Sequence, residues 1–369
     1  LFLGLPMAAL SPLAFLRRPQ RWLEAIHRHR GTLSPAPNFA YELCGRKIDG
    51  RVLDELDLSS WRVALNGAEP VSPDTLERFA RRFARCGFRA QTMMPVYGLA
   101  ETTVALTFAP LNHPPRIDRV ARDSFQQRRR AQPAAASERE PLRFVSVGRA
   151  LPEHEVRIVH EDGRPVGERI EGQIEFRGPS TMQSYYRNPQ ATADACTPDG
   201  WMRTGDLGYW AQGELFITGR TKDVVIKAGC NYYPHEIEEV AADAAGVRRG
   251  CVVAFSVPDD KTGTEALVVV AETRASDRTA QASIRSEIKR RIASACCIAP
   301  DVVELLRPQT IPKTPSGKLR RSATRQLYLA RRLTARRAPA WWQATRLVAG
   351  TVMARLKRGA SPNRPRPLP

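Results

Sequence analysis

The sequence predicts an α/β protein in which a larger unit, made of an α/β part and an antiparallel β segment, precedes a smaller α+β unit. Three observations support this fold class. Strand-like and helix-like patterns alternate near the N-terminus, a period of two begins at about residue 144, and the order of elements changes again after residue 222. The 369 residues also exceed the roughly 150 residues of a typical domain, so more than one unit is expected.

The first part of the chain alternates strands with helices. The apolar runs 61–65 and 88–95 predict two strands. Between them, Ser72 is a capping residue that precedes a proline at the first helical position, which predicts the start of a helix. Apolar residues then recur with the spacing of one buried helical face, at Leu76, Phe79, Ala80 and Phe83.

The stretch 115–141 interrupts this pattern. It is polar and rich in Arg and Gln, so we expect a surface insertion or a flexible excursion. Beyond it, apolar and polar residues alternate over 154–160 and 173–176, with a turn at Asp162-Gly163. This alternation predicts an antiparallel β segment.

The smaller unit is predicted to begin at Lys222. Pro234 opens a helix, the runs 251–257 and 266–271 predict two strands, and 283–295 predicts a second helix. With a further strand, the order is α, β, β, α, β, which is typical of a small α+β domain. We therefore expect a large unit at 1–221, a small mobile unit at 222–330 and a tail at 331–369.

The charge is concentrated near the C-terminus. The chain has a net charge of +19, and fifteen basic residues but no acidic one lie in 311–369, so the first 310 residues carry only +4. Residues 341–358 are amphipathic if helical and could rest on an anionic membrane surface. A helix packed on its own unit or a disordered tail is the favoured alternative. Nucleic acid is not expected, because no basic stripe with interleaved aromatic residues precedes the tail.

Other features of the composition exclude several classes of protein. No stretch approaches the roughly 20 apolar residues of a transmembrane helix. Seven scattered cysteines without a CxxC pair favour a reducing, cytoplasmic setting, with peripheral contact at the inner membrane surface through the tail left open. Because the chain starts at Leu1 within an apolar stretch, we expect a fragment whose N-terminal part is missing.

Two polar segments follow predicted strands and are candidates for a ligand site. They are Asn66-Gly67-Ala68-Glu69 and Tyr97-Gly98-Leu99-Ala100-Glu101. Ligands of open α/β sheets bind beyond the carboxyl ends of the strands, where glycines let the backbone approach. A tyrosine there offers a flat face for a base, and a glutamate offers an oxygen for Mg²⁺. Two turns beside a core tyrosine are the alternative interpretation.

Two further constellations carry charge. Asp206 could accept hydrogen bonds from ribose hydroxyls, and Arg220 could donate to a ribose or phosphate oxygen. A structural Asp–Arg pair in a β-hairpin is the alternative. Lys318 follows a Ser-Gly turn in a segment that lacks the first glycine and the final Ser or Thr of a P-loop. It suits a mobile cation delivered to a negatively charged reacting group, and a solvated lysine is the alternative.

Together these motifs resemble the adenylate-forming superfamily of acyl-CoA synthetases, peptide-synthetase adenylation domains and luciferases, and more narrowly the fatty acyl-AMP ligases. The resemblance covers roughly 1–330, and 115–141 is similar to the insertion that separates acyl-AMP ligases from acyl-CoA ligases. Family members carry a Ser/Thr/Gly-rich phosphate loop that is absent from 1–95, which again predicts N-terminal truncation. The matching segments are SPAPNFAYELC (34–44), VYGLAE (96–101), WMRTGDLG (201–208), GRTKD (219–223), KAGCNYYPHEIE (227–238) and PKTPSGKLRRSATR (312–325).

The resemblance implies a role for each matching position. Lys318 reaches in from the small unit to bridge the substrate carboxylate and the α-phosphate, Glu101 helps to hold Mg²⁺, and Lys222 is the hinge. In the nucleotide site, Tyr97 stacks on the adenine and Asp206 and Arg220 contact the ribose. The other residues expected in that site are Gly67, Ala68, Glu69, Gly98 and Ile217.

The implied activity is ATP-dependent conversion of a fatty acid to acyl-AMP and pyrophosphate, with Mg²⁺, followed by transfer to the phosphopantetheine thiol of an acyl carrier protein. One alternative is a fatty acyl-CoA ligase that uses free CoA. Another is an inactive fragment that acts as a membrane-surface binding module through its tail.

Overall fold

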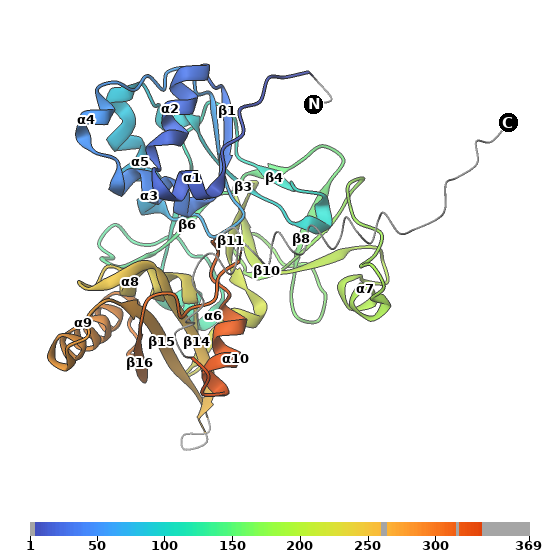
Figure 1. The fold of residues 1–369 in the computed structure, drawn as a ribbon. Helices are drawn as coiled ribbons and strands as arrows, with labels where there is room; N and C mark the ends of the chain where they lie inside the picture. Colours follow the sequence, from blue (N-terminus) through green and yellow to red (C-terminus); the bar gives the residue numbers. More distant parts are fainter. Residues whose placement is uncertain (1–3, 260–263, 315–316, 334–369) are drawn as a thin grey trace, which may run out of the picture.

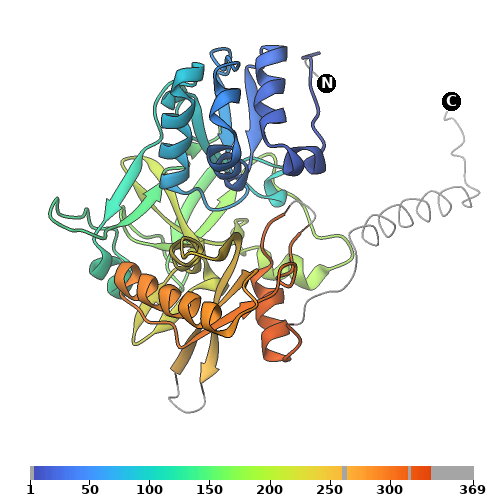
Figure 2. The ribbon, with the colours of Figure 1, turned by 60° about the vertical axis from the view of Figure 1, so that its left-hand side comes forward.

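The computed structural model describes residues 4–259, 264–314 and 317–333, whose arrangement is drawn in Figures 1 and 2. A five-stranded sheet organises the N-terminal part, in the order β1-β2-β3-β4-β7. The first three strands are parallel, and the other two join in antiparallel fashion. The strands are β1 (Leu33–Ala36), β2 (Val63–Asn66), β3 (Met93–Tyr97), β4 (Thr107–Phe108) and β7 (Arg149–Ala150).

Helices pack on this sheet through a core that is rich in aromatic side chains. Trp22, Tyr41, Trp61 and Phe79 are all buried, and the ring centroids of Trp22 and Trp61 lie 5.3 Å apart. Such ring contacts add to the free energy gained by burying apolar surface. The helices are α1 (Pro12–Arg17), α2 (Gln20–His29), α3 (Asn38–Lys47), α4 (Gly50–Leu53) and α5 (Pro73–Phe83).

The start of α5 confirms the predicted capping signal. The Ser72 hydroxyl accepts a hydrogen bond from the Thr75 N–H, and Pro73 occupies the first helical position. The strand predicted over 88–95 begins later, at Met93. The chain instead forms a 3₁₀ turn at Ala90–Thr92, where the Thr92 hydroxyl donates to the Trp61 carbonyl.

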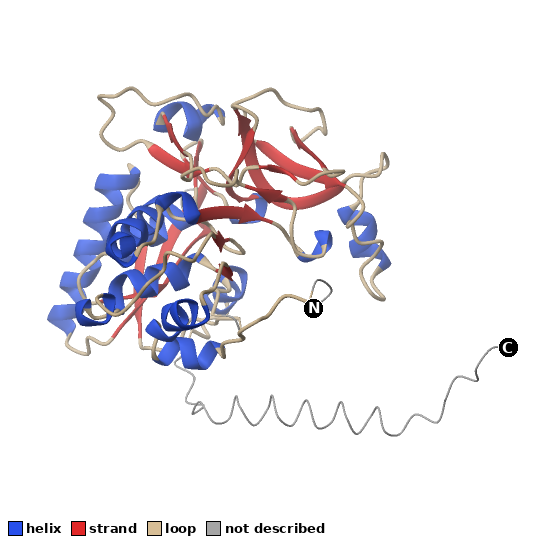
Figure 3. Cartoon of the chain, turned by 90° about the horizontal axis from the view of Figure 1, so that it is seen from above, coloured by secondary structure: helices blue, strands red, loops and turns tan. Residues whose placement is uncertain are grey.

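A four-stranded antiparallel sheet follows, in the order β11-β10-β9-β8, and confirms the predicted antiparallel segment. Figure 3, viewed from above, shows strands and loops dominating this region, whereas helices flank the strands elsewhere. The elements are β8 (Glu155–Val159), β9 (Gly172–Arg177), α7 (Pro189–Ala195), β10 (Met202–Ala211) and β11 (Glu214–Arg220).

The expectation that 115–141 is a flexible excursion is wrong. This stretch contains β5 (Ile117–Val120) and α6 (Arg122–Arg128), and β5 pairs with β6 (Leu142–Val145). Val120 and Phe125 are fully buried, and Phe125 contacts the rings of Phe144 and Tyr209. The stretch is folded because a few apolar side chains anchor it and some of its arginines, among them Arg122 and Arg129, pair with acidic side chains.

The last described part forms what we call the C-terminal block, residues 225–333. Its sheet has the order β14-β15-β16, with α8 and α9 on one face and α10 on the other. Ile284, Ile288 and Ile292 are buried, as their spacing predicts. The elements are β12 (Val225–Lys227), β13 (Cys230–Tyr232), α8 (Pro234–Ala242), β14 (Val247–Asp259), β15 (Thr264–Thr273), α9 (Arg278–Cys296), β16 (Val302–Leu306) and α10 (Arg321–Leu329).

The amphipathic helix considered for 341–358 lies outside the described residues, as does most of the tail at 331–369. None of the helices in the described ranges has the length and apolar character that crossing a bilayer requires.

Candidate active site

The two loops predicted to form a ligand site lie at one edge of the first sheet. β2 and β3 are adjacent and parallel, so the segments beginning at Gly67 and Gly98 leave the sheet side by side. A Cβ at Gly67 would lie 2.7 Å from the Val96 carbonyl oxygen, and a Cβ at Gly98 would lie 2.0 Å from that of Val104. Only glycine fits either position, which keeps the backbone of both loops in close contact.

Ala68 and Glu69 continue the first loop. Ala68 has a φ of 68°, in the left-handed region that non-glycine residues rarely adopt. This conformation is followed directly by Glu69, whose carboxylate accepts a hydrogen bond of 2.5 Å from the Phe39 N–H at the start of α3. A carboxylate is favourable there because the first N–H groups of a helix have no partner within it.

The pKa of Glu69 is also affected by charges in the C-terminal block. Burial raises the pKa of Glu69, and this is opposed by the Phe39 N–H and by the ammonium groups of Lys318 and Lys313. The catalytic candidate Lys318 therefore lies near Glu69, although the two residues are far apart in the sequence.

Tyr97, Asp206 and Arg220 come together around one carboxylate. The Tyr97 hydroxyl donates to Asp206 Oδ2 at 2.7 Å, and Arg220 Nε donates to Asp206 Oδ1 at 3.0 Å. Asp206 and Arg220 face each other across β10 and β11. The Asp206 N–H also donates to the Thr204 hydroxyl at 3.0 Å, which fixes the backbone at this point. Ile217, on β11, packs with Tyr97 against the same apolar cluster.

The exposure of these residues suits a ligand site. Asp206 is only 7% exposed, whereas the Arg220 side chain is 60% exposed. Burial raises the pKa of Asp206, and the hydrogen bond from Tyr97 and the charge of Arg220 oppose that rise. A ribose could thus approach a positioned carboxylate from the solvent, beside the exposed Arg220 guanidinium.

Glu101, the metal candidate, lies in a 3₁₀ turn, Ala100–Thr102, after β3. Its Oε1 accepts a hydrogen bond of 2.7 Å from the Tyr185 hydroxyl, which raises the pKa of Tyr185 to about 12. No group of three or more His, Cys, Asp or Glu residues that could hold a metal ion occurs in the described ranges. One carboxylate with a remaining oxygen fits Mg²⁺ that arrives with a nucleotide, because Mg²⁺ commonly uses one or two carboxylates plus phosphates.

Lys318 sits on a short hairpin. Lys313 and Leu319 are paired across it, the Thr314 N–H donates to the Lys318 carbonyl at 2.8 Å, and the Lys318 N–H donates to the Thr314 hydroxyl at 3.0 Å. Gly317 has a φ of 91°, and a Cβ there would lie 3.8 Å from the Phe39 ring. The hairpin therefore touches the first turn of α3, the helix that Glu69 caps.

The hinge candidate Lys222 is exposed, in the 3₁₀ turn Thr221–Asp223 that joins β11 to the C-terminal block. Its neighbour Asp223 accepts a hydrogen bond from Arg321, which also donates to both Glu238 oxygens, at 3.0 and 2.9 Å. Arg321 follows Lys318 by three residues, so one guanidinium links the lysine hairpin, the hinge turn and α8.

The sequence analysis did not identify three residues of the site: Phe39, Tyr185 and Arg321. Phe39 and Arg321 lie within the quoted segments 34–44 and 312–325, which was the available signal. Nothing near Tyr185 in the sequence points to Glu101, because their contact spans 84 positions.

Comparison with known proteins defines the class. The AMP-binding enzyme family matches residues 1–186, half of the chain, and the chain belongs to that family within the adenylate-forming superfamily. A medium-chain-fatty-acid acyl-carrier-protein ligase of Teredinibacter turnerae is 34% identical over 88% of this chain and 53% of its own length. A 4-hydroxyphenylalkanoate adenylyltransferase of Mycobacterium marinum is 39% identical over 86% of this chain and 53% of its own length.

Solved structures agree on the fold. A structure from a study of fatty acyl-adenylate ligases of E. coli and L. pneumophila superposes with a TM-score of 0.80 at 38% identity, covering 86% of this chain and 56% of that one. A fatty acid AMP ligase from Legionella pneumophila gives a TM-score of 0.58 at 32% identity, over 87% of this chain and 57% of that one. The chain thus spans about half the length of the relatives it matches.

Proposed function

We propose that this chain carries the ribose site and the mobile lysine of a fatty acyl-AMP ligase. Its substrates are a fatty acid and ATP, its first product is acyl-AMP, and the acyl group then passes to the phosphopantetheine thiol of an acyl carrier protein. One observation carries the proposal: Tyr97 and Arg220 both bond to the buried Asp206 carboxylate, while the Lys318 hairpin contacts Phe39, whose N–H donates to Glu69. The name of the Teredinibacter turnerae relative supports the fatty acid and the carrier protein.

In the first step the fatty carboxylate attacks the α-phosphorus of ATP. A new oxygen–phosphorus bond forms, the bond from the α-phosphorus to the bridging oxygen breaks, and pyrophosphate leaves with that electron pair. The Lys318 ammonium offsets the charge that develops between carboxylate and phosphate. Asp206 accepts the ribose hydroxyls, and the Tyr97 ring supplies a flat face for the base. Holding the two reactants in line lowers the barrier by up to about 7–11 kcal/mol in ideal cases.

Glu101 is the residue that would hold Mg²⁺. The bound ion would neutralise phosphate charge and orient the pyrophosphate leaving group. Tyr185 holds one oxygen of Glu101, so the other is left to face the ion. The hydrogen bond thus fixes the direction of the carboxylate before the nucleotide arrives.

In the second step we propose that the C-terminal block turns about Lys222 and withdraws Lys318, so that the thiol can reach the acyl-AMP. The domain division at 221/222 is part of this proposal. The exposed position of Lys222, in the turn that joins β11 to the block, supports it, because hinges are a few loop or element-terminal residues that absorb changes in backbone torsion.

A fatty acyl-CoA ligase is the alternative, and the packing of 115–141 bears on it. The Arg122 guanidinium donates to Glu236 at 2.6 Å, and Asn231 donates to the Gln126 carbonyl at 3.0 Å, so α6 is bonded to residues beyond the hinge. These contacts restrain the C-terminal block and favour a carrier-protein acceptor over free CoA. Thioester formation assayed with holo carrier protein and with CoA decides between the two, and efficient turnover with CoA would support the alternative.

ATP–pyrophosphate exchange driven by a medium-chain fatty acid tests the first step. We expect exchange in the parent protein and loss of at least 100-fold in Lys318→Ala, because the cation at the reacting phosphate is removed. Lys289→Ala is the matched control, since Lys289 is an exposed lysine of α9. Unchanged exchange in Lys318→Ala would refute the role of this lysine.

A further inference from the structure

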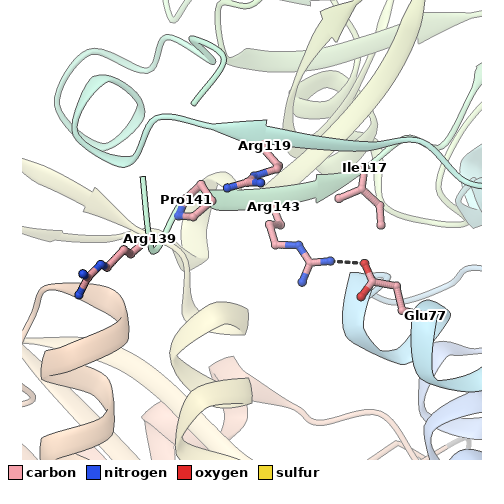
Figure 4. Close-up of a pocket in the computed structure, with 6 residues that line it drawn as sticks. All are labelled: Glu77, Ile117, Arg119, Arg139, Pro141 and Arg143. Carbon is pink, nitrogen blue, oxygen red and sulfur yellow. Dashed lines mark hydrogen bonds and ion pairs between the residues drawn. The ribbon is translucent and has the colours of Figure 1, made fainter. Parts of the chain in front are cut away.

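A cavity separate from the nucleotide residues lies between α5 and the β5–β6 ribbon (Figure 4). Its volume is about 380 Å³. Ile117 and Pro141 give it apolar walls, and three guanidinium groups give it a positive lining. The complete set of lining residues is Glu77, Ile117, Arg119, Arg139, Pro141 and Arg143.

The three arginines of this cavity differ in their partners. Arg143 donates to Asp74 at 2.6 Å and to Glu77, so its charge is satisfied within the protein. Arg119 is exposed, and among the residues that the structure describes its side chain donates only to the Glu138 carbonyl, at 3.4 Å. Arg139 is exposed and makes no hydrogen bond or ion pair with any residue of the described ranges. In Figure 4, Arg119 and Arg139 extend away from α5, whereas Arg143 turns toward Glu77.

The cavity also lies next to the C-terminal block. The Arg122 guanidinium donates to the Glu140 carbonyl at 2.9 Å and to Glu236 of α8 at 2.6 Å. Glu140 directly precedes Pro141 in the cavity wall, so one guanidinium joins this wall to the block. Figure 4 shows helices of the block on the same side as Arg139. The cavity therefore lies at the junction of the first sheet's helices, the 115–141 stretch and the block proposed to move.

We propose that this arginine-lined cavity, called the arginine junction, is a docking surface for an acidic protein face, and specifically for the carrier protein that brings the thiol. The inference rests on the proposed function and names the surface that its second substrate uses. Arginine presents a planar fork of donors that matches a carboxylate, and it is enriched at protein interfaces. The bonds from Arg143 to Asp74 and Glu77 are an intramolecular example of the same recognition.

The form of the cavity suits side chains of a larger partner. The guanidiniums of Arg119 and Arg139, neither of which forms an ion pair within the described ranges, stand at its exposed side, and the apolar walls allow a desolvated contact beside them. Charges placed this way accelerate encounter with an oppositely charged protein and make binding sensitive to salt. A partner held at the junction would also touch the part of the protein that must turn before thioester formation.

The test measures binding of fluorescently labelled holo acyl carrier protein from a bacterial fatty-acid synthase to the full chain. We expect the double variant Arg119→Glu/Arg139→Glu to raise the Kd at least tenfold. The control Arg62→Glu/Arg89→Glu makes the same charge change at two exposed arginines elsewhere on the N-terminal part, and should leave the Kd within about twofold. The affinity of the parent protein for the carrier should fall as salt is raised from about 50 to about 300 mM, because salt screens the attraction between exposed charges.

Each result has one meaning. Equal effects of the two double variants, or no effect of either, would overturn the docking surface. Binding of inorganic phosphate that depends on Arg119 and Arg139, with carrier binding unchanged, would overturn it in favour of a small-anion site. ATP–pyrophosphate exchange measured on the same samples reports separately on the proposed function, because the junction residues do not belong to the nucleotide set.

Discussion

The Tyr233 hydroxyl lies 2.8 Å from each carboxylate oxygen of Glu171, and both side chains are almost fully buried. Glu171 precedes β9 in the antiparallel sheet, whereas Tyr233 directly precedes α8 in the C-terminal block. Thr218 of β11 donates to the same carboxylate. The ring of Tyr233 contacts Phe125 and Phe144, so a residue beyond the proposed hinge completes a core that belongs mainly to the other parts.

Glu171 should make stability depend on pH. Burial raises the pKa of Glu171, so the folded protein binds a proton more tightly at this site than the unfolded chain does. The contribution of the site is therefore most favourable below the unfolded pKa of about 4.3, and is lost as the pH rises toward the folded pKa. Glu171→Gln removes this titration and should gain stability relative to the parent as the pH rises from about 4 to 7. Urea unfolding across that range tests it, and a constant difference would contradict it.

Replacing Asp206 should lower the catalytic efficiency with ATP more than replacing an exposed aspartate elsewhere. Asp206→Asn removes the charge that Tyr97 and Arg220 position, and hydrogen bonds to charged groups contribute about 1.5–3 kcal/mol. We expect kcat/KM for ATP in pyrophosphate exchange to fall about 10- to 100-fold. The control is Asp199→Asn, because Asp199 is an exposed aspartate that pairs with Arg157. Similar losses in both variants would show that the effect is not specific to the ribose site.

Arg321 should contribute far more to stability than an exposed arginine with equally good geometry. Arg321→Ala leaves Asp223 and Glu238 without their cation, and their side chains are only 12% and 13% exposed. Breaking a buried pair costs about 3–5 kcal/mol. Arg290→Ala removes an exposed pair with Glu287 and should cost less than about 1 kcal/mol. Thermal and denaturant unfolding of the two variants provide the comparison, and equal losses would contradict the assignment.

Ala68 should tolerate glycine better than a branched side chain. Its positive φ disfavours any residue with a Cβ, and most of all a β-branched one. We expect Ala68→Val to lower the free energy of unfolding by about 1–3 kcal/mol and Ala68→Gly to change it by less than about 1 kcal/mol. Ala84→Val is the control, because Ala84 has an ordinary φ of −55°. A loss in that control as large as in Ala68→Val would exclude backbone strain as the cause.

Arg122 should influence the choice of acyl acceptor. Arg122→Ala removes the bond to Glu236 and loosens the attachment of 115–141 to the C-terminal block. We expect the ratio of CoA thioester to carrier thioester to rise about tenfold, within the usual range of coupling between sites. Arg129→Ala is the control from the same stretch, because Arg129 pairs with the exposed Glu161. If neither variant changes the ratio, the contact does not restrain the block.

Local signals were sufficient for much of the fold. Ser72 and Pro73 marked the start of α5, and Ile284, Ile288 and Ile292 marked the buried face of α9, because capping and periodicity act within a few residues. The pairing of β10 with β11 likewise brought Asp206 and Arg220 together across a short hairpin, as the motifs implied.

Contacts between segments far apart in the sequence could not be predicted from such local signals. The 115–141 stretch was expected to be a surface insertion or a flexible excursion because its seven arginines outnumber its three large apolar side chains, yet two of these, Val120 and Phe125, are fully buried. The bond from Tyr185 to Glu101 joins segments that no periodicity relates. Burial depends on which surfaces meet, and composition averaged over a segment does not contain that information.

If the C-terminal block turns as proposed, the position of Glu69 would couple that rotation to proton uptake. Glu69 caps α3 and its acidity is increased by Lys318, so withdrawal of that lysine would leave the carboxyl more basic. A turn of the C-terminal block would then take up part of a proton from solution, and lowering the pH would favour the withdrawn state. The balance between making the adenylate and discharging it would thus shift with the acidity around the protein, through a side chain that takes no part in either bond.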